Sequence, residues 1–393
     1  MTFTELKLAR RRRAVPVGAN LGDRTFSEVR RLCYAGLDET TLLREVAGRL
    51  RRAVPFEGYC AHAVDPLSGL LTHAPSEEMG GEREARLFLE HLYFAEDVNE
   101  YNSMAKSRRP VALLSEATGG RLERCLRYRE LMEPLGYGHE LRSVFTAGKE
   151  LWGAIDVRRE KGRPDFEPRE IMLFRRVAPH LGAGLKAAML RSQAPSPKGG
   201  DGIPGVLVLD NRGRVSHYTG PAERWLEELE DPDSRWHEGR GPSAWRVGKG
   251  LPAAVWTVIS TLRRALNPQT ERDRASIPRV CVRTRAGRWL TLQASLSEPD
   301  TDGNSDTVIV IEPPGPKEML WLNAASYGLT ARERAVVDLV MRGFSTAQIS
   351  ATLYISKYTV QEHLCSAFDK VGVRDRQALV KRLFFDNIYP TLL

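Results

Sequence analysis

The sequence predicts a multidomain α+β protein that ends in an all-α segment of four helices. Two stretches rich in proline, glycine and serine divide the 393 residues, at 192–204 and 312–318. Before the second stretch, apolar residues alternate in the strand period at many places, between segments of helical period. After it, they recur only at helical spacing.

These breaks define the expected order of the segments. A chain of this length holds two to four domains at ~100–200 residues each. We expect a basic N-terminal extension at 1–19, a first domain at 20–191, a linker at 192–202, a second domain at 203–312, a linker helix at 313–328 and a helical domain at 329–393.

The charge and cysteine content narrow the function classes. The formal net charge is +8, and its surplus lies near both ends, which suits a nucleic-acid partner. The five cysteines lie far apart without a CxxC pair, so we expect a reducing compartment and no metal site. The basic start lacks an apolar h-region and no 18-residue apolar run follows, which predicts a cytoplasmic protein without a membrane span.

The first domain alternates between helices and strands. Helical patterns cover about 26–52 and 82–95, and strand candidates include YCAHAV, GLLTHA, PVALL, LRSVFTA and LWGAIDVRR. Gly148-Lys149 reads as a hairpin turn. A closing helix begins at Pro168 and carries an apolar stripe over 171–189, which fits either a face packed on the sheet or a dimer seam. We expect Pro179 to kink it.

This layout resembles a GAF domain: an antiparallel sheet with helices and a long closing helix. The resemblance implies a module that senses a small molecule or a protein. Candidate ligand-lining residues are Tyr59, His62, Phe94, Tyr101, Phe145 and Trp152, although a core role fits most of them better. Cys60 fits a buried inert thiol better than a bilin anchor or an iron ligand. No cofactor is expected.

The second domain reads as two strands, helices and then three strands. GVLVLD and GRVSHYT flank a turn, AERWLEELE and PAAVWTVISTLRRAL are helical, and RVCVRTRAGRWLTLQASLS alternates on both sides of a turn before TVIVIEP. This order resembles a PAS domain, a small α/β sensory fold.

Capping residues predict the four C-terminal helices. They are Thr330 with Glu333, Ser345 with Gln348, Ser356, and Asp375. In the third helix, SKYTVQEHLCSAFDKVGV, one side should carry Val360, Leu364, Ala367, Phe368 and Val371, and the opposite side Tyr358, Glu362, Cys365 and Asp369. Two short helices joined by a three-residue turn form a helix-turn-helix.

The same residues resemble the DNA-binding domain of LuxR-type regulators. The matching string is LT-x-RE-R, G-x-S-x-x-x-I, L-x-IS-x-x-TV-x-x-HL and K-x-GV-x-x-R-x-x-LV. Behind GAF-like and PAS-like segments, it is similar to a one-component regulator of the actinobacterial kind. The resemblance implies a homodimer on double-stranded DNA with an imperfect palindrome, a small-molecule effector, and contact with RNA polymerase. It also implies a dimer contact through 376–385, with Leu379, Leu383 and Phe384.

The resemblance, extended to neighbouring side chains, gives the candidate DNA-binding set: Lys357, Tyr358, Thr359, Gln361, Glu362, Cys365, Ser366, Lys370, Arg374 and Arg376. Basic residues at the helix ends can hold phosphates, which leaves its centre free to read bases. There Gln361 can pair with adenine, and Glu362 can accept a hydrogen bond from cytosine. His363 fits packing and phosphate contact better than base reading.

Three other functions remain open from the sequence. A GAF-fold enzyme is disfavoured because HExxH, GxSxG and complete P-loop patterns are absent, and we expect no catalytic residues. A response regulator would need a parallel βα repeat near its start, which the first 120 residues lack. A protein-interaction module without its own ligand is the third.

Overall fold

The computed structural model describes residues 17–74, 76–77, 82–93, 98–191, 202–229, 251–266, 278–301 and 303–385. Most of the predicted basic extension and Phe94 lie outside these residues. Within them, no helix is long and apolar enough to cross a membrane.

The first part of the chain is built on a six-stranded antiparallel sheet. The strand order is β2-β1-β6-β5-β4, with β3 paired to β1. The strands are β1 (Gly58–Asp65), β2 (Leu70–His73), β3 (Ser76–Glu77), β4 (Val111–Leu113), β5 (Tyr137–Ala147) and β6 (Glu150–Glu160). The predicted hairpin is confirmed, because β5 and β6 pair across a turn in which Gly148 has a φ of 69°.

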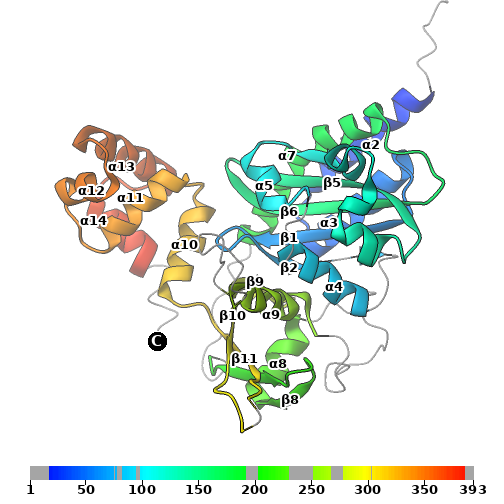
Figure 1. The fold of residues 1–393 in the computed structure, drawn as a ribbon. Helices are drawn as coiled ribbons and strands as arrows, with labels where there is room; N and C mark the ends of the chain where they lie inside the picture. The colour runs from blue at the N-terminus through cyan, green and yellow to red at the C-terminus, as the bar shows by residue number, and fades with distance from the viewer. Residues whose placement is uncertain are drawn as a thin grey trace, which may run out of the picture.

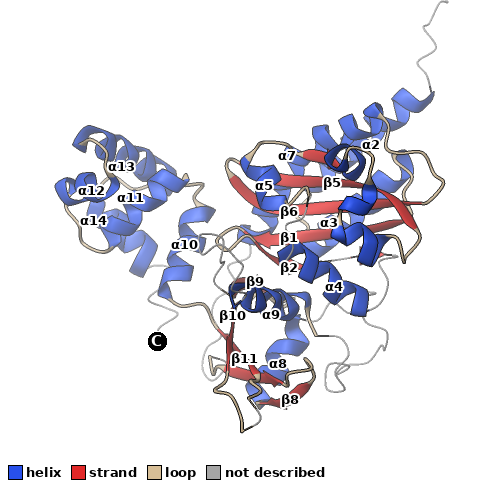
Figure 2. Cartoon of the chain, viewed as in Figure 1, coloured by secondary structure: helices blue, strands red, loops and turns tan. Residues whose placement is uncertain are grey.

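Helices cover both faces of this sheet (Figures 1 and 2). One face packs against α2 (Val17–Cys33), α3 (Glu39–Ala53) and α7 (Pro168–Arg191). The other lies under α4 (Glu82–Tyr93), α5 (Tyr101–Lys106) and the π-helix η2 (Tyr128–Met132), with α6 (Leu114–Thr118) and η1 (Leu122–Arg124) nearby. The helical patterns predicted over 26–52 form the two helices α2 and α3, because the chain turns between Tyr34 and Asp38.

The closing helix α7 lies very close to the sheet. A Cβ on Gly182 would stand 2.1 Å from the carbonyl oxygen of Thr146, so only glycine fits there. The predicted stripe, including Phe174, Leu181 and Leu185, is buried in the core of this part. That stripe therefore packs on the sheet in this chain. The helix continues through Pro179.

The second part has a five-stranded antiparallel sheet in the order β8-β7-β11-β10-β9. Its elements are β7 (Gly205–Leu209), β8 (Val215–Tyr218), α8 (Gly220–Leu229), α9 (Ala253–Leu266), β9 (Arg279–Arg283), β10 (Trp289–Leu296) and β11 (Thr307–Glu312), in the predicted order. Its core is continuous with one core of the first part, since Phe88 and Leu71 belong to the same buried cluster as Val255 and Ile259. Helix α9 lies between the two sheets (Figure 1).

The C-terminal part is entirely helical. It contains α10 (Pro316–Ser326), α11 (Ala331–Met341), α12 (Thr346–Leu353), α13 (Lys357–Val371), α14 (Arg376–Val380) and the π-helix η5 (Lys381–Phe385). Within the expected linker helix of 313–328, α10 begins at Pro316, because proline is tolerated in the first helical turn. The helices form a separate lobe beside the first part (Figure 1).

Candidate nucleic-acid interface

Side-chain caps set the start of each helix in the C-terminal lobe. Thr330 and Glu333 form a complete capping box on α11, and Ser345 and Gln348 form another on α12. Ser356 Oγ accepts a hydrogen bond from the backbone N–H of Thr359. Asp375 caps α14 in the same way, by accepting from Ala378 N–H. All four predicted caps are therefore present.

The turn between α12 and α13 depends on two residues. Tyr354 adopts a left-handed conformation, with a φ of 53°, which is uncommon for an aromatic residue. Ser350 Oγ donates a hydrogen bond of 2.6 Å to the carbonyl oxygen of Ile355 and so joins the turn to α12. This turn places α13 against the rest of the lobe, where it packs on α11 and α12.

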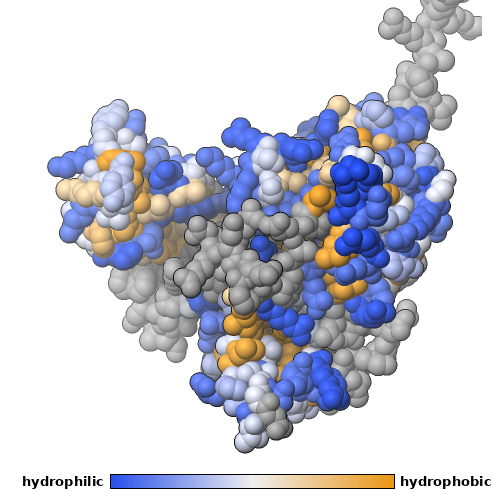
Figure 3. Space-filling view, in the orientation of Figure 1, coloured by the Kyte–Doolittle hydropathy of each residue, from blue (hydrophilic) through white to orange (hydrophobic). Residues whose placement is uncertain are grey.

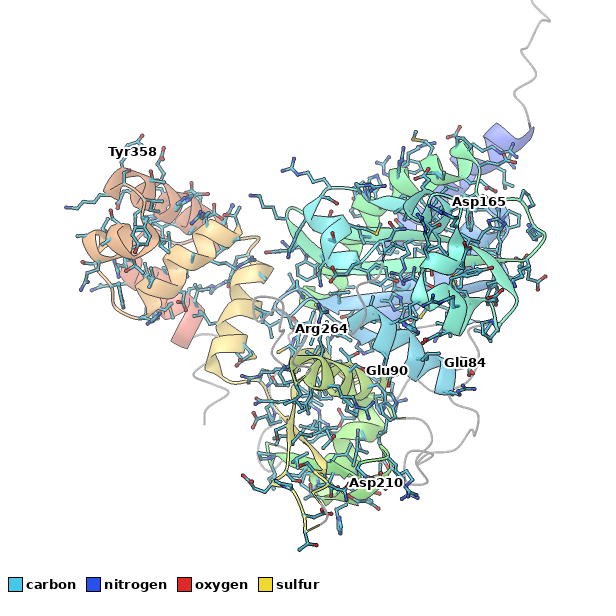
Figure 4. All side chains as sticks on the ribbon, viewed as in Figure 1. Glu84, Glu90, Asp165, Asp210, Arg264 and Tyr358 are labelled. Atoms are coloured by element: carbon cyan, nitrogen blue, oxygen red, sulfur yellow. The ribbon has the colours of Figure 1, made fainter. Side chains whose placement is uncertain are left out.

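Helix α13 has one buried and one exposed side. Val360, Leu364, Ala367 and Val371 are buried in the core of the lobe, while Phe368 is half-buried. The opposite side exposes Lys357, Tyr358, Gln361, Glu362, Cys365 and Asp369. The predicted division of the helix is confirmed. Figure 4 shows Tyr358 pointing outward at the far end of the lobe, away from the other two parts.

The exposed side combines two large aromatic rings with polar groups. Tyr358 is 73% exposed and Tyr354 is 95% exposed. A tyrosine hydroxyl can donate to a phosphate oxygen, so Tyr354 joins the candidate set. Tyr354 was not among the residues predicted from the sequence. The signal for it was a tyrosine, in place of the usual glycine, at the end of a predicted helix. Much of the visible surface around this lobe is hydrophilic (Figure 3).

The carboxylate of Glu333 accepts hydrogen bonds from three groups. Lys370 Nζ lies 2.8 and 2.7 Å from the two oxygens of Glu333, and Ser366 Oγ donates to Oε1 at 2.6 Å. The carboxylate also accepts from Thr330 N–H in the capping box. Lys370 and Ser366, expected to face DNA, thus tie α13 to α11.

Hydrogen bonds decide the ionisation of Glu333. Burial by itself would raise the pKa of its carboxyl group. The hydrogen bonds from Lys370, Ser366 and Thr330 outweigh burial and lower the pKa to about 2. The carboxylate is therefore charged at neutral pH, and it holds the ammonium group of the exposed Lys370 against α11.

The remaining candidates differ in their exposure and in the groups that they contact. Arg376 donates from Nη2 to the carbonyl oxygen of Phe344, so it fastens the start of α14 to the loop after α11. Arg374 is exposed in the turn before α14. Thr359 is half-buried beside Ser356, with their hydroxyl oxygens 2.9 Å apart. Lys357, Arg374 and Lys370 are the exposed cations of the candidate set, and of these Lys370 is paired with Glu333.

Two of the three apolar residues expected at a dimer contact lie inside the lobe, and the side chain of Phe384 is outside the described part of the structure. Leu379 and Leu383 are both fully buried in its core, next to Ala324 of α10 and Leu329. In this arrangement neither side chain is accessible to a partner.

The predicted ligand-lining residues do not converge on one site. Tyr59, Phe145 and Trp152 belong to the core beneath α2, α3 and α7, whereas His62 and Tyr101 lie on the opposite face of the sheet. Side chains alternate along a strand, so Tyr59 and His62 on β1 must face opposite ways. Phe94 is outside the described residues.

Comparison with known proteins identifies the C-terminal lobe. Residues 327–383 match the family model described as "Bacterial regulatory proteins, luxR family". The spore germination protein GerE of Bacillus subtilis is 43% identical over 56 residues, which are 14% of this chain and 76% of GerE. The chain therefore belongs to the luxR family of bacterial regulatory proteins and is a DNA-binding transcriptional regulator of that type.

A second relative also matches over a short stretch. The response regulator RamR of Streptomyces coelicolor is 40% identical over 55 residues, which are 14% of this chain and 27% of RamR. Among solved structures, a GAF domain from a phosphoenolpyruvate-protein phosphotransferase of Coxiella burnetii aligns over 45% of this chain and 99% of its own. That alignment has 16% identity and a TM-score of 0.34.

Proposed function

We propose that the protein is a one-component transcriptional regulator, in which the first two parts sense a small molecule or a protein partner and control DNA binding by the C-terminal lobe. One observation carries this proposal: α13 buries its apolar side and leaves its polar side, with Lys357, Gln361 and Glu362, free of the other parts. An exposed polar helix of this kind fits the major groove.

The exposed side chains of the lobe are proposed to make two kinds of contact with DNA. Lys357, Arg374, Tyr354 and Tyr358 contact phosphates and fix the register of the helix. Gln361, Glu362 and Cys365, near the centre of the exposed side, read base edges.

A homodimer on an imperfect palindrome would double the few contacts that one lobe makes. We also propose that the protein contacts RNA polymerase, acts in the cytoplasm and catalyses no reaction.

Contacts between the three parts offer a route for control. Arg334 of α11 forms an ion pair with Glu150 of β6. Arg279 of β9 pairs with Glu318 of α10 at 3.1 Å. A cavity of about 660 Å³ lies where these elements meet. These ion pairs join the lobe to the other two parts, so a change in the sensory parts that breaks them can shift its position.

The antiparallel sheet of the first part supports a one-component regulator over a response regulator. A receiver domain needs parallel strands, whereas every pairing of strands in the described residues is antiparallel. Incubation with acetyl phosphate followed by intact mass measurement is expected to show no phosphoryl addition. A stoichiometric addition would favour the response regulator instead.

Binding-site selection tests the main proposal. The full-length protein is expected to enrich a two-fold symmetric sequence from a random duplex pool. Residues 316–393 alone should retain the same half-site with weaker binding, because one lobe is complete in itself. Specific binding by a fragment ending at residue 312 would overturn the assignment.

A further inference from the structure

One face of the first sheet is charged although helices cover it. Its side chains come from alternate positions of β1, β5 and β6, so they point together beneath α4, α5 and η2. Arg127, which lies at the start of η2, joins them. The buried members, here called the polar chamber, are Cys60, His62, Tyr101, Arg127, Glu140, Arg142, Asp156 and Arg158, none more than 4% exposed.

Glu140 is shared by three guanidinium groups. Arg127 Nη2 lies 2.6 Å from Glu140 Oε2, in a two-point interaction completed by Nε. Arg142 Nε and Arg158 Nε lie farther away, at 3.4 and 3.5 Å. Burial would raise the pKa of Glu140, but these arginines lower it, so the carboxylate is charged.

Asp156 is already occupied by its neighbours. Its Oδ1 accepts from Tyr101 OH at 3.0 Å and lies 3.1 Å from His62 Nε2. Its Oδ2 lies 2.9 Å from Arg158 Nη2, in an ion pair without hydrogen-bond geometry. Burial lowers the pKa of His62 and outweighs the opposing effect of Asp156, so the imidazole stays neutral.

The polar chamber therefore holds an excess of positive charge. Three arginines face two carboxylates. Outside the chamber, Glu130 pairs with His91 at 3.2 Å, and because Glu130 is half-exposed, solvent screens its charge. An uncompensated charge in such a place costs several kcal/mol.

Two guanidinium atoms add to that cost. Arg142 Nη2 and Arg158 Nη1 are buried and have no hydrogen-bond partner among the described residues. Arg142 and Arg158 lie on the adjacent strands β5 and β6. Asp156, two residues before Arg158 on β6, is directly opposite Arg142. Two donors held in this way suit the oxygens of one small anion.

A metal ion does not fit the same place. Cys60, His62 and Asp156 offer donor atoms within 4.8 Å of one another. However, burial raises the pKa of the Cys60 thiol well above its usual value, so it is not a ready ligand. The surrounding arginines would also repel a cation.

We propose that the polar chamber binds an oxyanion, the carboxylate or phosphate group of a small metabolite, through Arg142 and Arg158. His62 and Tyr101 line the same face and fix its orientation. This inference rests on the proposed sensory function and names the class of effector. The anion neutralises the excess charge and supplies acceptors for the free guanidinium atoms, so it stabilises the first part of the chain.

Calorimetric titration of the full-length protein tests this. Inorganic phosphate and succinate are titrated separately at constant ionic strength, with chloride as the supporting anion. At least one should bind saturably with one site per chain. Phosphate binding indicates a phosphorylated metabolite, and succinate binding indicates a carboxylate.

Variants locate the site. Arg158→Met should weaken binding at least tenfold. Arg142→Lys keeps the charge but loses the planar fork, so it should also weaken binding and gives a second measurement if Arg158→Met does not fold. Arg212→Met, at an exposed turn of the second part, should bind like the wild type. Circular dichroism checks that each variant is folded.

Two outcomes overturn the inference: no saturable binding of either anion by folded wild-type protein, or wild-type binding by both chamber variants. Binding-site selection on the same preparation separates this from the proposed function. If DNA is bound specifically but no anion is, only the chamber assignment fails. If no specific DNA binding is found, the proposed function fails regardless of the titration.

Discussion

At the scale of single residues, Glu362 is an acid on a helix that faces a polyanion. It is exposed on α13, and no ion pair joins it to any other described residue. A carboxylate there can accept from cytosine N4 and repels phosphates in wrong registers. Glu362→Ala should therefore relax preference at one base position per half-site, by ~1–3 kcal/mol of discrimination, while non-specific affinity holds or rises. Binding-site selection with the variant measures this, and an unchanged motif would contradict it.

The two lysines of α13 should behave differently. Lys357 is exposed at the start of the helix, whereas Lys370 is held by both oxygens of Glu333. Lys357→Met should weaken binding to all sequences and lower the salt slope by about one, with no change in melting temperature. Lys370→Met should lower the melting temperature instead. Salt-dependent mobility shifts and thermal melts of both variants distinguish these effects, and a lower slope for Lys370→Met alone would reverse the assignment.

Glu333 should make the C-terminal lobe sensitive to acid. Its pKa is about 2 in the folded lobe, compared with about 4.3 when unfolded. Because the folded pKa is the lower one, its stabilisation is present above pH ~4.3 and is lost as pH falls towards ~2. The effect is at most about 3 kcal/mol, because solvent around the exposed Lys370 screens the interaction. Urea unfolding of residues 316–393 should show Glu333→Gln less stable at pH 7, with the gap to wild type closing below pH 4. A constant gap would exclude this linkage.

At the scale of elements, two helical glycines should respond in opposite ways to alanine. Gly182 of α7 lies against the backbone of Thr146, whereas Gly48 of α3 has open space where its Cβ would be. Gly182→Ala should destabilise the first part by ~1–3 kcal/mol, because α7 must move away from the sheet. Gly48→Ala should stabilise it by up to about 1 kcal/mol through helix propensity.

Thermal melting of the two single variants checks this pair. A stable Gly182→Ala protein would show that α7 can shift without loss of packing. The Gly48→Ala protein is the control for the added methyl group itself.

At the scale of the whole molecule, the Arg334–Glu150 pair should restrain the lobe. Both side chains are mostly buried, at 13% and 17% exposure, so this pair is screened less by solvent than a surface pair. Glu150→Gln should speed hydrogen exchange at the start of α11 without changing exchange in the sheet cores. Glu133→Gln removes a half-exposed pair with Lys161 and is the matched control. Equal exchange in both variants would mean that the lobe is held by other contacts.

The sequence by itself determined the local features of this protein. Caps, turn glycines and the period of apolar residues depend on neighbours within a few positions, so the helices of the C-terminal lobe, the β5–β6 hairpin and the two sides of α13 were predictable. The string of matching residues was also sufficient to identify the DNA-binding family. The same period placed Phe174 and Leu185 on one apolar stripe of α7, although it could not say what covers them.

Only the tertiary structure decided which distant side chains meet. Lys370 and Ser366, which were predicted to contact DNA, also bind Glu333 of α11, 37 and 33 residues away in sequence. Tyr59 and Trp152, which were predicted to line a ligand site, lie in the core beneath α2, α3 and α7, because pairing of the strands sets their side of the sheet. The buried charges of Arg142 and Arg158 were not predicted, because burial depends on the helices that fold over a strand.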